Sequence, residues 1–262
     1  MTNPYLPEKV KILDVVQETA DTFSFTIDKV FNHLPGQFVM AGLLGFGEAP
    51  FGICSYSKKF TQLCIRNVGT VTKAITSLKK GDYLFVRGPY GHGFPMLDLK
   101  GKDLMIVGGG TGVAPLRGIV QYAQAHRSMF GNVSLYLGFR TVDDLLFKND
   151  LKQWEKQFDF NLTLDNPPKK WKYAKGVVTP LVEKAKINKE NTVGITVGPP
   201  IMMKFVIQSF KKLGMKDDQI FLSYERFMQC GIGKCGHCRV HDVYVCKHGP
   251  VLNYNVAKSL KE

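Results

Sequence analysis

The sequence of 262 residues lacks the features that mark membrane-spanning and exported proteins. It has no run of about 18 or more apolar residues, which a transmembrane helix would need. Its opening residues, MTNPYLPEKV, show no charged stretch followed by an apolar one, as a secretory signal would. The six cysteines do not form the pattern of a disulfide framework. These absences predict a cytoplasmic protein with no membrane span.

Long blocks of like charge are also missing, although the formal net charge is +13. Lysines are scattered singly or in pairs, as in SLKKGD and SFKKLG. No helix-turn-helix, zinc-finger or RNP pattern is present. The sequence therefore does not indicate nucleic-acid binding, and the basic surface suits an acidic protein partner or an anionic cofactor.

Residues 1–99 predict a β domain. The segment TFSFTI, residues 22–27, alternates apolar and polar side chains, which is the period of a half-buried strand. Further short apolar segments follow, each bounded by glycine, proline or polar residues, at 36–43, 51–57, 62–68 and 81–89. This spacing is typical of a small antiparallel barrel or sandwich.

From residue 100 the pattern changes to apolar strands that alternate with helical segments. The strand predicted at 103–110 precedes a helix over 114–126, and similar units follow as far as residue 222. Such alternation predicts a parallel sheet with α/β architecture. Residues 223–262 are too few and too rich in glycine and cysteine to build a core of their own, so an inorganic group is expected to stabilise them.

Four cysteines with the spacing C-x4-C-x2-C-x7-C lie in this last segment. The spacing is that of plant-type [2Fe–2S] sites, whereas structural zinc sites usually show separated C-x2-C pairs. Interspersed glycines allow the loop to fold tightly with its N–H groups turned inward. A zinc knuckle is the alternative. His237 is expected to point outward, and Cys54 and Cys64 to be buried free thiols. The predicted metal ligands are Cys230, Cys235, Cys238 and Cys246.

Two glycine-containing turns follow predicted strands of the α/β domain. IVGGGTGVAPL, residues 106–116, places backbone N–H groups and a helix N-terminus where a pyrophosphate can bind. It is not a P-loop, because no Gly-Lys-Ser/Thr follows, and it is not a complete Rossmann fingerprint, because Val113 stands where a third glycine would be. TVGPPIMM repeats the arrangement at a later strand. Together the turns predict a nucleotide crevice.

A nucleotide crevice and an iron–sulfur loop in one chain predict electron transfer. Pyridine nucleotides release electron pairs, a [2Fe–2S] cluster accepts single electrons, and a flavin can do both. The β domain is therefore expected to carry a flavin. The turn that includes Gly69 and Thr72 is a candidate for contact with it, although an ordinary strand and a capped helix would give the same pattern.

Several further motifs follow one another along nearly the whole chain: EAPFGICSYS, IRNVGTVTKAI, RGPYGHGFP, VGGGTGVAPLRG, GFRTVDDLLFKNDL, VGPPIMM, YERFMQCGIGKCGHCRV and YVCKHGPVLNY. In this order they resemble the ferredoxin-reductase-like electron-transfer subunits. Within that family the likeness is strongest to the subunits that serve anaerobic sulfite reductases, followed by those of sulfhydrogenases and dihydroorotate dehydrogenases. The resemblance implies an FAD-binding barrel at 1–99, an NAD(P)-binding α/β domain at 100–222 and a [2Fe–2S] module at 223–262.

The family's flavin motif, Arg-x-x-Ser, is altered in this chain. Ala49 and Gly52 occupy the matching positions, so Arg66 and the turn from Gly69 to Thr72 are expected to supply the phosphate contacts. Backbone groups of 50–54 would contact the isoalloxazine. The resemblance implies FAD contacts at Pro50, Phe51, Gly52, Ile53, Cys54, Ile65, Arg66, Asn67, Gly69, Val71 and Thr72.

The resemblance also implies a set of NAD contacts and favours NADH over NADPH. Arg140 would suit a 2′-phosphate, whereas Asp143 or Asp144 would suit a free ribose hydroxyl. The implied contacts are Gly110, Thr111, Gly112, Val113, Ala114, Pro115, Arg140, Asp144, Gly198, Pro199, Pro200, Met202 and Met203.

The predicted function is electron transfer from NADH through FAD and a [2Fe–2S] cluster to a partner, with no catalytic side chain identified. The resemblance implies iron–sulfur and sirohaem-type subunits of a sulfite reductase as partners in a hetero-oligomer. A dihydroorotate dehydrogenase or sulfhydrogenase could be served by the same relay. A zinc-stabilised scaffold protein is the alternative that performs no redox chemistry.

Overall fold

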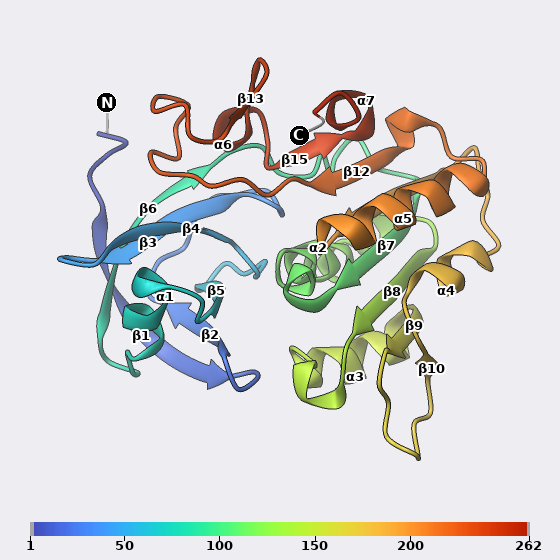
Figure 1. Ribbon diagram of the computed structural model, residues 1–262, viewed down its shortest axis with the longest axis horizontal. Coiled ribbons are helices and arrows are strands. Elements are labelled where there is room, and N and C mark those ends of the chain that lie inside the picture. The colour runs from blue at the N-terminus through green and yellow to red at the C-terminus, as the bar shows by residue number, and fades with distance from the viewer. Residues whose placement is uncertain (1–2, 261–262) are drawn as a thin grey trace.

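The computed structural model describes residues 3–260, which form two sheets and a C-terminal segment beside both (Figure 1). The first sheet is antiparallel, and its strand order is β4-β3-β6-β1-β2-β5. Its strands are β1 (Glu8–Gln17), β2 (Thr22–Ile27), β3 (Phe38–Leu43), β4 (Gly47–Gly52), β5 (Thr61–Arg66) and β6 (Tyr83–Tyr90).

The first sheet closes into a barrel. Its two outer strands meet where Ile53, just after β4, pairs with Leu63 of β5, and the N–H of Cys54 donates to the carbonyl of Gln62 at 3.0 Å. Closure removes the unpaired edges that an open sheet would expose. The short helix α1 (Thr70–Thr76) lies beside β3, β4 and β5, and apolar side chains such as Ile12 and Phe25 fill the interior.

The second sheet has the order β10-β9-β8-β7-β11-β12-β15. Neighbouring strands are parallel except that β15 runs antiparallel to β12. The strands are β7 (Asp103–Gly109), β8 (Val133–Phe139), β9 (Asp159–Leu164), β10 (Ala174–Lys175), β11 (Thr192–Val197), β12 (Ile220–Ser223) and β15 (Val251–Asn253).

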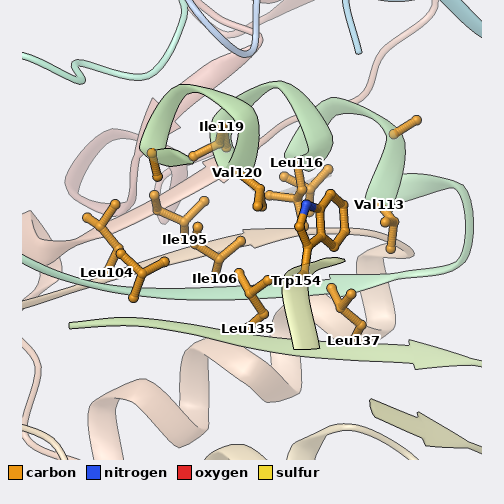
Figure 2. Close-up of a cluster of buried hydrophobic side chains, with 14 of the residues drawn as sticks. Leu104, Ile106, Val113, Leu116, Ile119, Val120, Leu135, Leu137, Trp154 and Ile195 are labelled. Atoms are coloured by element: carbon orange, nitrogen blue, oxygen red, sulfur yellow. The ribbon is translucent and has the colours of Figure 1, made fainter. Parts of the chain in front are cut away.

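Helices cover both faces of this sheet, as expected for parallel strands joined by crossover helices. Figure 2 shows one face, where side chains of α2 (Val113–Ala125) pack on Ile106 and Leu135 of the strands, with Trp154 of α3 (Lys148–Gln157) beside them. The opposite face packs on α4 (Thr179–Glu183) and α5 (Pro200–Lys212). Two cores therefore hold the sheet, one on each side.

The C-terminal segment leaves the second sheet and returns to it. It contains the two-stranded ribbon of β13 (Arg239–Val240) and β14 (Val243–Tyr244), then α6 (Val245–His248), β15 and α7 (Tyr254–Ala257). Figure 1 shows α6 and β13 above the barrel strands and β15 beside β12. No helix among residues 3–260 has the length and apolar character needed to cross a bilayer.

The predicted fold class, an antiparallel barrel followed by a parallel α/β sheet and a small C-terminal module, is confirmed. Five strands were not predicted: β1, β10, β13, β14 and β15. In β1 few side chains are buried and the register shifts after Ile12, which weakens the alternation. The strand predicted at 51–57 was wrong beyond Gly52, because the chain there closes the barrel through the single bridge at Ile53.

Candidate functional site

A pocket of about 710 Å³ lies where the strands of the second sheet end, the usual place for a nucleotide in this architecture. Turns after β7, β8 and β9, the start of α5 and a hairpin turn of the barrel form its walls. The lining residues include Thr19, Asp21, Thr22, Arg66, Gly109, Gly110, Thr111, Gly138, Phe139, Arg140, Asp144, Leu146, Asp165, Pro199, Ile201, Met202 and Phe205.

The glycine-rich turn between β7 and α2 fits tightly against the turn before α5. A Cβ at Gly112 would lie 2.5 Å from the carbonyl oxygen of Val197 and 2.6 Å from the Cα of Gly198, so only glycine allows the two turns to touch. Gly110 has a φ of +54°, and a Cβ there would meet nothing within 4 Å. The Gly110 backbone is therefore open to a ligand at the start of α2.

Arg140 and Asp144 form an ion pair at one side of this pocket. The guanidinium donates to the carboxylate at 2.9 Å, and the Thr141 N–H and hydroxyl donate to the same carboxylate at 3.0 and 2.7 Å. Burial alone would raise the pKa of Asp144, but the hydrogen bonds from Thr141 and Arg140 lower it below its ordinary value. Asp144 is therefore ionised at neutral pH.

A second pocket of about 420 Å³ lies between the barrel and the second sheet. It shares Thr22, Arg66 and Thr111 with the first pocket, so the two cavities are contiguous. Its other lining residues include Ala49, Pro50, Phe51, Gly52, Cys64, Val68, Thr72, Ala114, Pro115, Ser223, Tyr224, Glu225, Arg226, Met228 and Pro250. Barrel, sheet and C-terminal segment all contribute to it.

The turn from residue 67 to 72 forms internal hydrogen bonds at the rim of the second pocket. The Thr72 hydroxyl accepts from the N–H groups of Val68 and Gly69, both at 2.9 Å, and donates to the Gly69 carbonyl at 3.0 Å. Arg66 donates from Nε to Asp21 at 2.7 Å. Thr72 thus fixes the shape of the turn, while the remaining N–H groups of the Arg66 guanidinium can reach a ligand.

Several polar contacts hold the barrel against the α/β unit, among them those of Arg117 and Glu18. Arg117 of α2 pairs with Asp150 and donates to the Cys54 carbonyl at 3.0 Å and the Gln62 side chain at 2.6 Å. Glu18, between β1 and β2, accepts from the N–H of Phe147 at 2.9 Å. Since a hydrogen bond to a charged group contributes roughly 1.5–3 kcal/mol, the bonds from Arg117 to Cys54 and Gln62 are a strong constraint on how the two units meet.

The cysteine loop directs backbone N–H groups at its own sulfur atoms. Cys230 Sγ accepts from the N–H groups of Ile232, Lys234 and Cys235 at 3.5, 3.3 and 3.4 Å. Cys246 Sγ accepts from Gly233 at 3.0 Å. The loop's three glycines have φ between +73° and +84°, as the sequence suggested. This is the environment that thiolate ligands require.

The four thiols contact one another in two pairs, Cys230 with Cys235 and Cys238 with Cys246. Backbone N–H groups, that of His237 foremost, lower the pKa of Cys235 to about 7, and burial raises that of Cys246 to about 12. Within residues 3–260 no group of three or more His, Cys, Asp or Glu side chains is placed to hold a metal ion.

Comparisons with known proteins agree with this geometry. Residues 106–208 match the oxidoreductase NAD-binding domain, and residues 225–256 match the iron–sulfur cluster binding domain of dihydroorotate dehydrogenase B. The gamma subunit of sulfhydrogenase 2 from Pyrococcus furiosus is 36% identical over 278 residues, which cover 96% of each chain. The chain belongs to the ferredoxin-reductase-like electron-transfer subunits.

Two other similar proteins cover nearly the whole chain. A probable electron transfer subunit of dihydroorotate dehydrogenase B (NAD(+)) from Methanocaldococcus jannaschii is 33% identical over 98% of this chain and 93% of that one. A solved structure of the NADH-dependent reduced ferredoxin–NADP oxidoreductase, determined in work on flavin-based electron bifurcation, aligns with a TM-score of 0.79 and 27% identity. That alignment covers 97% of this chain and 90% of the other.

This electron-transfer subunit therefore has an FAD-binding barrel, an NAD(P)H-binding α/β domain and a [2Fe–2S]-binding C-terminal segment. The predicted cofactor classes are confirmed. The match of residues 225–256 to an iron–sulfur domain favours the cluster over the zinc alternative. The residues present fit the groups, because the two pockets share lining residues and the loop supplies four cysteines, with backbone N–H donors to the sulfurs of Cys230, Cys238 and Cys246.

The predicted FAD and NAD contacts lie in several different places in the structure. Gly110, Thr111, Arg140, Asp144, Pro199 and Met202 line the first pocket. Pro50, Phe51, Gly52, Arg66, Thr72, Thr111, Ala114 and Pro115 line the second. Gly198, Pro200 and Met203 line a separate cavity between α5 and α7. Ile53, Cys54, Ile65, Asn67, Gly69, Val71, Gly112 and Val113 line neither of the first two pockets; of these, Ile53, Cys54, Ile65 and Val113 are fully buried.

Several residues that line the two pockets were not predicted from the sequence, because no local pattern marks them. Asp21 and Thr22 belong to the barrel hairpin between β1 and β2, which is far in sequence from the strand ends of the second sheet that line the same pocket. Glu225 and Met228 were read as part of the cysteine segment, and yet they line the second pocket. These side chains reach the pockets only because segments that are distant in the sequence lie together in the fold.

Replacing Cys246 with alanine should abolish cluster binding while flavin remains bound, because Cys246 lines neither of the two pockets. Iron content of anaerobically purified protein should fall from about two per chain to near zero, and released flavin should be unchanged. Cys54→Ser is the matched control, since its hydroxyl can replace the thiol that donates to the Gln62 carbonyl. Full iron content in Cys246→Ala would exclude Cys246 as a ligand.

Proposed function

We propose that this subunit takes electrons from NADH and delivers them through FAD and the [2Fe–2S] cluster to a partner subunit. A bound flavin accepts a hydride and gives up single electrons, which a [2Fe–2S] cluster can accept. The role of the chain is to hold the three groups close together and in this order.

Continuity of the sites is the observation that carries this proposal. The nucleotide pocket meets the flavin pocket at Thr22, Arg66 and Thr111. Met228 lines the flavin pocket and packs in one cluster of buried side chains with Cys238 and Cys246. Each site thus shares side chains with the next, which supports a direct path from nucleotide to flavin to cluster.

In the nucleotide pocket the residues bind and orient the dinucleotide. The Gly110 backbone at the start of α2 presents N–H groups to a pyrophosphate, where the helix dipole favours negative charge. Apolar side chains of Ile201, Met202 and Phe205 line the same cavity and shield the reacting ring from water.

The charges of the nucleotide pocket support a preference for NADH. Its two arginines are each paired with a carboxylate, Arg66 with Asp21 and Arg140 with Asp144, and Asp165 adds a further negative charge. A 2′-phosphate beside Arg140 would be repelled by the Asp144 carboxylate, whereas a ribose hydroxyl can donate to that carboxylate. These pairs therefore disfavour NADPH.

NADH should bleach the flavin of the isolated subunit, and Gly110→Val should prevent this. Valine is strained at a φ of +54° and places two methyl groups where the backbone must approach the pyrophosphate. Reduction by dithionite should be unaffected. Gly81→Val is the matched control, because Gly81 also has positive φ and open space but lies outside both pockets. Bleaching by NADH at the normal rate in Gly110→Val would contradict this placement of the nucleotide.

Asp144→Asn should raise the use of NADPH, because it removes the carboxylate that holds Arg140. We expect kcat/KM for NADPH to rise by roughly tenfold, which corresponds to about 1.4 kcal/mol. The value for NADH should fall, because its ribose hydroxyl then donates to a neutral amide instead of a carboxylate. Asp143→Asn is the control, since the Arg140 ion pair is made with Asp144 alone. Steady-state kinetics with both nucleotides measure the difference, and an unchanged preference in Asp144→Asn would argue against this role of the ion pair.

The partner is inferred from resemblance. The order of the motifs predicts that the partners are the iron–sulfur and sirohaem-type subunits of a sulfite reductase. The relatives named above instead favour a sulfhydrogenase-type or dihydroorotate-dehydrogenase-type complex. The gamma subunits of the two P. furiosus sulfhydrogenases, at 36% and 38% identity, exceed the 33% of the M. jannaschii subunit. We propose a hetero-oligomer of one of these kinds, in the cytoplasm, where the six free cysteines would stay reduced.

Anaerobic purification of the native complex should identify the partner. With NADH as donor, the complex should form sulfide from sulfite, dihydroorotate from orotate, or hydrogen from protons, and only one of these activities should accompany the copurified chain. The isolated subunit should reduce artificial one-electron acceptors with NADH and form no sulfide from sulfite. Sulfide production by the subunit alone at a catalytic rate would overturn the relay.

A further inference from the structure

A buried arginine of the barrel has no role in the function described so far. Arg87, on β6, is 6% exposed. Its guanidinium pairs with the Glu48 carboxylate of β4 through two nitrogens, Nε at 2.8 Å and Nη2. It also donates to the Tyr90 hydroxyl at 3.3 Å and lies 5.4 Å from the centre of the Tyr90 ring.

The same guanidinium crosses from the barrel to the cysteine loop. Arg87 Nη1 donates to the carbonyl of Cys230 at 2.8 Å, and Nη2 lies 3.4 Å from the carbonyl of Gln229. The loop packs closely at this point, because a Cβ on Gly231 would lie 3.0 Å from Met40 of β3. A buried cation is therefore hydrogen-bonded to the peptide of the first cluster cysteine.

Arg87 keeps its charge in this position. Burial alone would lower the pKa of the guanidinium, but its hydrogen bonds to Glu48 and Tyr90 outweigh burial and raise the pKa above its ordinary value. The Glu48 side chain is more exposed than that of Arg87, 36% against 5%, so water screens the carboxylate more than the cation. Arg87 and Glu48 together therefore produce a net positive electrostatic field at the cysteine loop.

We propose that Arg87 is a positioning residue that raises the reduction potential of the [2Fe–2S] cluster. The inference rests on the proposed function, in which Cys230 is a cluster ligand. One-electron reduction of the cluster adds one negative charge, with the electron coming from the reduced flavin and no proton required. A buried cation stabilises that charge, and its hydrogen bond draws electron density from the Cys230 peptide, so the reduced state is favoured.

The test is a redox titration of the purified subunit with the cluster followed by EPR and the flavin by absorbance. Arg87→Met removes the charge while keeping much of the apolar side chain. The cluster potential should fall, with the equilibrium between reduced and oxidised cluster shifting by roughly tenfold, about 59 mV for one electron. The flavin potential should stay unchanged. Arg87→Lys retains the charge and should restore most of the cluster potential.

Two further variants separate this role from simple anchoring of the loop. Glu48→Gln removes the opposing carboxylate and should raise the cluster potential, which a purely structural contact would not do. Arg239→Gln is the matched control: Arg239 follows Cys238 directly, and its side chain is 52% exposed. Because water screens it, its loss should shift the potential far less than the loss of Arg87.

The outcomes distinguish this inference from the proposed function. Wild-type protein without a [2Fe–2S] signal would refute the relay itself. An intact signal with an unchanged or higher potential in Arg87→Met would overturn the role of Arg87 and leave the relay standing. If Arg87→Met fails to fold or to hold iron, Glu48→Gln decides, because an unchanged potential there overturns the inference and a raised one supports it.

Discussion

The antiparallel pairing of β12 with β15 is the constraint on which the arrangement of the three sites depends. Ser223 pairs with Val251, and the N–H of Tyr224 donates to the Pro250 carbonyl at 2.8 Å. The cysteine loop is therefore an excursion between two neighbouring strands, with both ends fixed at the edge of the nucleotide-binding sheet. Since Ser223, Tyr224 and Pro250 also line the second pocket, where we propose that the flavin binds, fixing the loop fixes one wall of that pocket.

Two arginines join the separate units, and arginine suits this task because its planar guanidinium offers several donors at once. Arg117 connects α2 to the barrel, and Arg87 connects the barrel to the cysteine loop. Each is mostly buried, is paired with one carboxylate and donates to a backbone carbonyl of another segment. A lysine ammonium could donate to either the carboxylate or the carbonyl, but it could not donate to both with the geometry that the guanidinium has.

The sequence predicted those features that depend on neighbouring residues. Alternation in residues 22–27, the glycine-rich turn at 106–116 and the spacing of four cysteines each reflect local backbone or ligand requirements, and the structure shows a strand, a strand-to-helix turn and an N–H-rich loop there. Contacts across the fold could not be predicted in this way. The residues next to Arg87 in the sequence do not indicate that Arg87 reaches Cys230. Those next to Asp21 do not indicate that Asp21 lines the same pocket as Gly110.

Loss of the Arg-x-x-Ser motif illustrates how such distant contacts bear on function. Ala49 and Gly52 line the flavin pocket and bring no charge to it, whereas Arg66 of β5 and Arg226 of the C-terminal segment line the same pocket. Positive charge is thus present at the site, but it comes from other elements. Because Arg66 also lines the nucleotide pocket, one cation faces both cavities. This supports the expectation that Arg66 contributes to holding the flavin phosphates, close to where the nucleotide enters.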